Sequence, residues 1–282
     1  MQLTAQQPED SRGRHGECAS ALPAVSEGRG PALIMLGGGV TGASAFASHA
    51  RILARDFRVV RLQTLNVDRA LRKAPLPHGY SIALERQAMA ASLDQLGLRG
   101  PVYIVGHSMG ALVALDFALD YPARVRALVL SEPPAFWVVP RDEASVSTEI
   151  REKRELTRHF GPTAEATDEQ LVAFLRSLGV PDPRPPRADE PGWTTWLARR
   201  ASLRGLRAIQ EHQDDVTRLK TFDRPVLIVT GANTTAFHRR INDILAGTLP
   251  WVERVELPGA HAAAIDEYST FAAILRSFLS SH

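Results

Sequence analysis

The residues best placed to do chemistry lie in the stretch 102–110, which reads VYIVGHSMG. Four strand-like residues run into the pentapeptide GHSMG, and a helical pattern follows it. A sharp strand–turn–helix connection needs small residues two before and two after the serine, and it lifts the serine hydroxyl clear of the sheet. Ser108 is therefore the candidate nucleophile. The amide of Met109, at the start of the helix, is expected to favour a developing negative charge.

Strand-like and helical patterns alternate on both sides of this turn. Helices are expected at 44–54, 81–96, 111–119, 241–249 and 267–279, with Ser81 as an N-cap. Strands are expected at 32–36, 57–62, 102–105, 125–130, 224–230 and 252–257. This alternation predicts an α/β fold, with a mostly parallel central sheet and helices on both of its faces.

The turn at Ser108, with its strand and helix, resembles the nucleophile elbow of the α/β-hydrolase family, in its serine hydrolase branch. We call this turn, residues 106–110, the elbow. In that family a loop after an early strand supplies a second amide to the oxyanion. Here the first predicted strand ends in the run GGGVTG, where Gly37 takes the place of the usual histidine. The resemblance implies that the amide of Gly39 acts together with that of Met109, with Gly38 or Val40 as alternative donors.

The same resemblance implies that His261, in the loop after the last strand, is the base that activates the nucleophile. The family most often carries its acid in a Gly-x-x-Asp pattern after the strand at 224–230. That loop reads GANTT here, with no carboxylate before Asp243. A second family position is the end of the preceding strand, where this chain has Glu132, and this placement is similar to that of zearalenone-type lactonases. We expect Glu132 to orient the histidine, and Asp243 is the alternative acid.

The remaining histidines are expected to play no part in the chemistry. His159, His212 and His238 lie on charged helical patterns, which predict solvent exposure. His107 lies inside the elbow, where the neighbours of a nucleophile point elsewhere. No histidine spacing indicates a metal site, and neither a metal nor a cofactor is expected.

Residues 135–221 form a helical, charged insertion that resembles the lid of the family, and residues 63–80 replace a glycine-rich family loop. Trp137 and Trp193 are the candidate substrate-binding residues. Together with Phe136 and Trp196 they either line an apolar pocket or form the core of the lid. We expect a core of residues 25–134 and 222–282, preceded by a disordered polar lead of residues 1–24.

Composition limits the partners of the chain. It has 282 residues, of which 44% are hydrophobic and 23% charged, and its net charge is +2. So small a charge gives no case for nucleic acid as a ligand. No apolar run approaches the ~20 residues of a membrane span. The single Cys18 points to a reducing compartment, so we expect a cytoplasmic protein. The sequence leaves open whether the chain forms a homodimer.

A serine at the elbow, in place of the aspartate of dehalogenases and epoxide hydrolases, favours acyl chemistry. The expected activity is hydrolysis of a small apolar ester or lactone through an acyl-enzyme formed on Ser108. Two alternatives stay open. The same triad serves carbon–carbon bond hydrolysis or acyl transfer, and the fold also serves proteins that only bind a ligand.

Overall fold

Seven strands form one sheet in the computed structural model, which describes residues 20–163 and 165–282. The strands are β1 (Ala24–Glu27), β2 (Ala32–Leu36), β3 (Arg58–Leu62), β4 (Val102–His107), β5 (Val125–Ser131), β6 (Val226–Gly231) and β7 (Val252–Leu257). Their order across the sheet is β1-β3-β2-β4-β5-β6-β7. β1 pairs antiparallel with β3, and the remaining pairings are parallel. The predicted fold class is confirmed.

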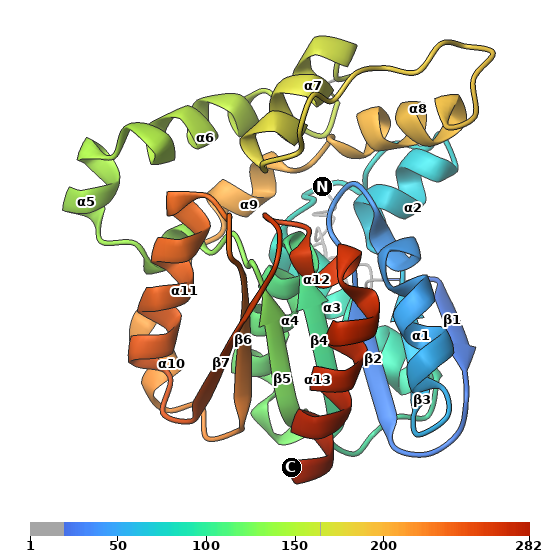
Figure 1. The fold of residues 1–282 in the computed structure, drawn as a ribbon, viewed down its shortest axis with the longest axis vertical. Coiled ribbons are helices and arrows are strands. Elements are labelled where there is room, and N and C mark those ends of the chain that lie inside the picture. The colour runs from blue at the N-terminus through green and yellow to red at the C-terminus, as the bar shows by residue number, and fades with distance from the viewer. Residues whose placement is uncertain (1–19, 164) are drawn as a thin grey trace, which may run out of the picture.

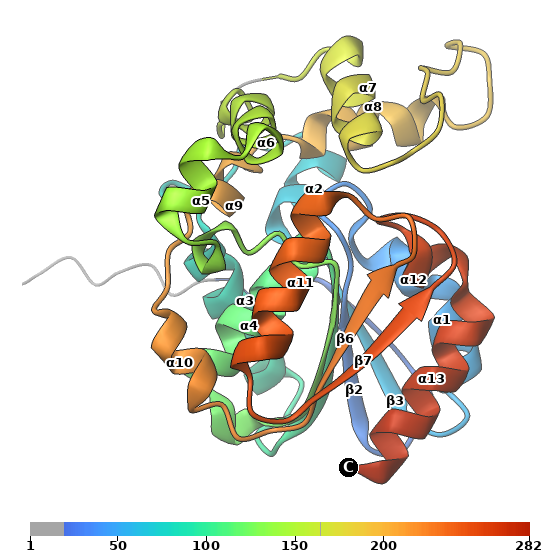
Figure 2. The same ribbon diagram turned by 60° about the vertical axis from the view of Figure 1, so that its left-hand side comes forward.

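Helices cover both faces of the sheet (Figures 1 and 2). One face carries α1 (Ala47–Leu53) and α13 (Tyr268–Ser281), and the other carries α3 (Ile82–Gln95), α4 (Met109–Asp120) and α11 (Ala236–Thr248). Successive strand residues point to opposite faces. Leu33 and Met35 of β2 therefore join the hydrophobic cluster under α1 and α13, while Ile34 and Leu36 join the one under α3 and α4.

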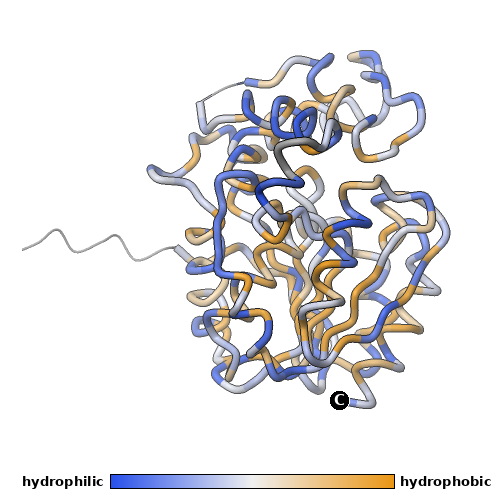
Figure 3. The backbone as a smooth tube through the Cα atoms, turned by 90° about the vertical axis from the view of Figure 1, so that its left-hand side faces the viewer, coloured by the Kyte–Doolittle hydropathy of each residue, from blue (hydrophilic) through white to orange (hydrophobic). Residues whose placement is uncertain are grey.

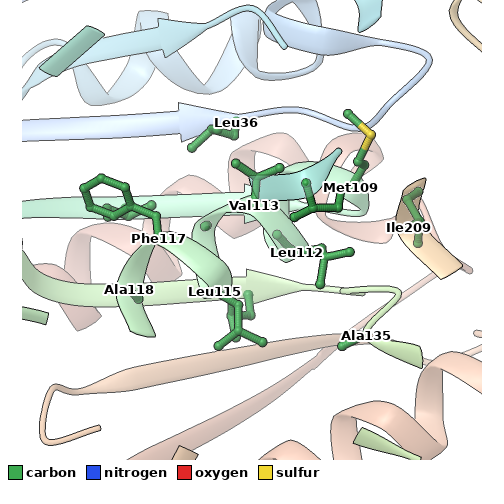
Figure 4. Packing of buried hydrophobic residues seen from close by; sticks show 14 of the residues in the cluster. Leu36, Met109, Leu112, Val113, Leu115, Phe117, Ala118, Ala135 and Ile209 are labelled. Carbon is green, nitrogen blue, oxygen red and sulfur yellow. The ribbon is translucent and has the colours of Figure 1, made fainter. Parts of the chain in front are cut away.

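The helix after the elbow is fixed on all sides. Every residue of α4 except Asp120 is buried, which is the pattern of a core helix rather than an amphipathic one. Figure 4 shows Leu112, Val113, Leu115 and Phe117 packed among the strands. Burying each such side chain contributes roughly 1.5–3 kcal/mol. The turn that carries Ser108 is thus built on a rigid support.

A helical layer lies over the carboxyl ends of the parallel strands (Figure 1). Polar and apolar residues are mixed along its backbone (Figure 3). It consists of α5 (Arg141–Val146), α6 (Thr148–Arg158), α7 (Asp168–Ser177), α8 (Trp193–Ser202) and α9 (Arg207–Glu211). We call this layer the lid. It ends earlier than the expected residue 221, because α10 (Val216–Lys220) lies beside α11 at the side of the core (Figure 2).

The expected bound of the N-terminal lead needs correction. The expected lead runs too far, since Leu22 is buried and Ala24 begins β1, while residues 1–19 lie outside the described part. The segment 63–80 contains a helix, α2 (Leu65–Leu71), which packs against α8 of the lid. Within the described residues, none of the helices is long and apolar enough to cross a membrane.

Candidate active site

The elbow places Ser108 at the tip of a strained turn between β4 and α4. Its backbone angles are φ 54° and ψ −127°, a combination that side-chain-bearing residues rarely adopt. A Cβ at Gly106 would lie 2.5 Å from the Cα of Ala111, and one at Gly110 would lie 2.3 Å from the carbonyl oxygen of Leu36. Neither position tolerates a side chain, which confirms the predicted reason for both glycines.

The expected acid lies directly after β5 and is held by the last residue of β6 and by the loop after it. Glu132 is 1% exposed and has φ 53°. Its Oε1 accepts a hydrogen bond from the amide of Gly231 at 2.9 Å, and its Oε2 accepts one from the hydroxyl of Thr234. Asp243, the alternative, lies at the surface in an ion pair with Arg254. Of the two carboxylates, only Glu132 lies beside the histidine loop.

The expected base faces this carboxylate. His261 Nδ1 lies 3.5 Å from Glu132 Oε2, and the residue is 4% exposed. Within the described residues, neither ring nitrogen of His261 has a hydrogen-bond partner. His261 and Ser108 line the same cavity. Such contacts are often long in a free enzyme and shorten when the substrate binds.

Two further histidines enclose the base, and sequence reasoning missed both. The ring centroid of His261 lies 4.4 Å from that of His238 and 4.9 Å from that of His107. Burial, followed by the nearby His261, lowers the pKa of both flanking rings well below 6.5, so they stay neutral. His238 also lies 3.8 Å from Glu132 Oε2.

The prediction that His238 is exposed is wrong, because it occupies the inward face of α11. Its neighbours Arg239 and Arg240 extend outward to Glu256 and Glu143. The prediction for His212 is wrong as well, since its side chain is only 10% exposed. The charged residues around His238 and His212 in the sequence thus did not indicate which way either ring points.

The expected oxyanion residues lie together at the elbow. A Cβ added to Gly38 would lie 3.3 Å from Ser108 Cβ, and one added to Gly39 would lie 3.1 Å from Met109 Sδ. The backbone of this loop therefore passes close to Ser108. A Cβ at Gly37 would lie 1.9 Å from the carbonyl oxygen of Gly42, which explains why a histidine does not fit there.

A buried hydrogen-bond cluster supports residues 37–39, the expected oxyanion loop. Asn66 Nδ2 donates to the carbonyl oxygens of Gly39 at 2.6 Å and Ser202 at 2.9 Å, so it joins the loop to the end of α8 in the lid. The amides of Leu65 and Asn66 donate to Glu85, as does the hydroxyl of Tyr80. Burial raises the pKa of Glu85 to about 7.

Two cavities meet at Ser108. The larger, of about 200 Å³, includes Gly39, Met109 and His261 in its wall. The smaller, of about 40 Å³, includes Phe136, Lys153, Leu156, Phe174, Phe237 and His238. The expected roles of Trp137 and Trp193 find no support here, because neither residue lines either cavity. Trp137 lines a separate arginine-rich cavity of about 600 Å³, and Trp193 is half-buried at the start of α8.

Among the described residues, two groups of side chains have a geometry that could hold a metal ion. Ligand atoms of Glu132, His238 and His261 lie within 4.8 Å of one another. An ion there would occupy the expected acid and base themselves, so metal binding and base action would exclude each other. The second group contains Asp116, His212 and Asp214, and arginines already pair with both of its carboxylates.

Comparison with known proteins agrees with the fold described above. The family model for the alpha/beta hydrolase fold matches residues 31–154. A Klebsiella pneumoniae protein named as a carbamate hydrolase, RutD, is 30% identical over 205 residues, which are 71% of this chain and 74% of that protein.

Solved structures of enzymes are similar in fold. A thermophilic esterase from Thermogutta terrifontis has a TM-score of 0.69 at 19% identity, covering 92% of this chain and 93% of its own. An enol-lactonase from Burkholderia xenovorans has a TM-score of 0.60 at 20% identity, covering 92% and 96%. With the elbow, the sheet order and the carbamate hydrolase relative, these findings show that the chain is a hydrolase of the α/β-hydrolase family.

Proposed function

We propose that the protein cleaves a carboxylic ester or lactone through an acyl-enzyme formed on Ser108. The observation that carries the proposal is the meeting of three chain segments: the elbow, the end of β5 and the loop after β7. They bring Ser108, Glu132 and His261 together at one edge of the sheet. This is the order nucleophile, acid, histidine that a serine hydrolase of this family requires.

The geometry supports a two-step reaction. In the first step Nε2 of His261 takes the hydroxyl proton of Ser108, and the serine oxygen bonds to the substrate carbonyl carbon. Glu132 stabilises the imidazolium that forms. The amides of Met109 and Gly39 bind the oxyanion, and each such donor lowers the barrier by about 3 kcal/mol. His261 then protonates the leaving alcohol, and water releases the acid in the second step.

A carbamate is the second candidate, because the relative at 30% identity is named as a carbamate hydrolase. A carbamate carbonyl is attacked by the same serine and stabilised by the same donors. The assay therefore compares simple esters, lactones and carbamates of matched size.

The proposal is tested by labelling with a fluorophosphonate probe, followed by peptide mass spectrometry. We expect rapid labelling at Ser108, no adduct there in Ser108→Ala, and much slower labelling in His261→Ala and Glu132→Gln. Asp243→Asn removes a surface carboxylate and is the matched control, which should label at the original rate. Unchanged labelling in Glu132→Gln would remove Glu132 from the triad. An unlabelled wild-type protein that binds ester analogues without turnover would instead show a ligand-binding protein.

A further inference from the structure

The lid carries one lysine whose environment differs from that of a surface cation. Lys153 lies on α6, on the same buried face as Ile150 and Thr157, and it is 8% exposed. Its Nζ donates a hydrogen bond of 2.7 Å to the carbonyl oxygen of Ser177 and lies 5.3 Å from the ring centroid of Phe237. Burying an ammonium group this far is costly unless something compensates its charge.

No carboxylate of the described residues forms an ion pair with this ammonium group. Glu149, one turn before it on α6, accepts the amide of Phe237 instead. Glu132 is occupied by Gly231 and Thr234. An ammonium group has three N–H donors, and the structure gives Nζ of Lys153 a single hydrogen bond. Its donor capacity is therefore incompletely used.

Lys153 lines the smaller of the two cavities at Ser108, and it is the one cationic residue in that wall. The other lining side chains are mostly apolar, among them Phe136, Leu156 and Phe174. The nearby His238 is held neutral by burial. A single cation in an apolar pocket beside the nucleophile is the arrangement that selects an anionic group at a fixed distance from the reacting carbonyl.

We propose that Lys153 binds a carboxylate on the acyl arm of the substrate, so that the enzyme prefers a half-ester of a short dicarboxylic acid, or a lactone with a short carboxylate side chain. This inference rests on the ester or lactone hydrolysis proposed above. The larger cavity, about 200 Å³, then takes the leaving group, and the smaller cavity takes the acyl arm.

The size of the small cavity limits that arm. Its volume of about 40 Å³ corresponds to roughly three water-sized units, at about 10–15 Å³ each. A methylene group followed by a carboxylate is of this size, which makes a malonyl arm the first to test. Hydrogen bonds to a charged partner typically change binding by roughly tenfold to a hundredfold.

The experiment compares monobenzyl malonate with benzyl malonamate, its neutral isostere, by following released benzyl alcohol. We expect wild-type kcat/KM to favour the malonate at least tenfold. In Lys153→Met this preference should vanish while turnover of the malonamate stays within about threefold. If Lys153→Met does not fold, Lys153→Gln removes the charge and keeps a donor for the carbonyl oxygen of Ser177.

Arg199→Met is the matched control, because Arg199 is the cation that lines the larger cavity. It should keep the preference for malonate. A lysine that only caps the end of α7 would change thermal stability without changing the ratio between the two esters, so an unchanged ratio in Lys153→Met overturns the inference. Equal turnover of both esters by the wild type, turnover of benzyl butanoate alone, or loss of the preference in Arg199→Met only would also overturn it.

A different result is expected if the proposed ester or lactone hydrolysis is itself wrong. In that case Ser108 is not labelled by the fluorophosphonate and no ester is hydrolysed, so both proposals fall together. Labelled Ser108 with turnover that ignores the charge of the acyl arm removes only the role of Lys153.

Discussion

Two buried glutamates flank the elbow, and they differ in what faces them. Glu132, on one side, accepts two hydrogen bonds and lies within 3.8 Å of His261 and His238. Glu85, on the other side, is fully buried and accepts hydrogen bonds only from neutral donors: the amides of α2 and the hydroxyl of Tyr80.

This difference separates two uses of a buried carboxylate. A carboxylate beside an imidazole can stabilise the positive charge that forms when the base takes a proton. A carboxylate among neutral donors has no such partner, and for Glu85 burial raises the pKa to about 7. We infer that the first supports chemistry, while the second fixes the start of α2 and, through it, the loop that holds Gly39.

The largest expected effect comes from Glu132→Gln. It removes the charge that stabilises protonated His261, and we expect kcat for ester hydrolysis to fall by roughly a thousandfold to ten-thousandfold. Glu85→Gln, measured in the same steady-state assay, should lower kcat less than threefold. Comparable losses in the two variants would erase the distinction between the glutamates.

Thr234→Asp sharpens the comparison when it is added to Glu132→Gln. Thr234 occupies the usual acid position of the family, and its hydroxyl already contacts Glu132 Oε2. An aspartate there should place a carboxylate near the same point and recover at least tenfold in kcat over Glu132→Gln alone. Thr234→Asn in the same background is the uncharged control. A folded double variant that recovers nothing would show that the carboxylate must come from β5.

Asn66→Leu tests the supporting side of the elbow. The change leaves the carbonyl oxygens of Gly39 and Ser202 without their shared donor, so the oxyanion loop loses its connection to the lid. We expect kcat to fall about tenfold with little change in KM, because oxyanion binding matters only in the transition state. A change confined to KM would place Asn66 in substrate binding instead.

The last prediction concerns stability rather than activity. We expect Glu85 to make the free energy of unfolding depend on pH. Its pKa is about 7 in the folded protein against an ordinary 4.5. Above pH 4.5 the folded state therefore retains a proton that the unfolded chain has released. The free energy of unfolding should fall as pH rises from 4.5 to 7, by about 3 kcal/mol from this group, and then level off. Urea unfolding at several pH values should show this contribution in the wild type and lack it in Glu85→Gln.

Local sequence patterns predicted the parts of the fold that local forces determine. The elbow is dictated by two glycines and the adjoining strand and helix. Glu132 was proposed from the family resemblance, because it directly follows a strand, and the structure brings it within 3.5 Å of His261. β1 was missed because it is a short, mostly exposed edge strand whose partner, β3, lies more than thirty residues away.

The remaining misses concern the direction of side chains on helices. Lys153 and His238 lie among charged neighbours, yet each faces inward because of the element packed against its own helix. Trp137 gave the opposite error. It was expected to contact the substrate, but it lines a different cavity from the two at Ser108. Which face of a helix is covered depends on contacts between distant segments, and no local pattern records them.

Under the mechanism proposed above, the backbone at Ser108 and Glu132 sets stability against activity. Both residues have positive φ angles, 54° and 53°, which suit glycine better than either native residue. Such strain typically costs on the order of 1–3 kcal/mol at each position. Glycine at either site would relax the chain and remove the reactive group. Under that mechanism, a stabilised variant that keeps its activity has to gain its stability at other positions.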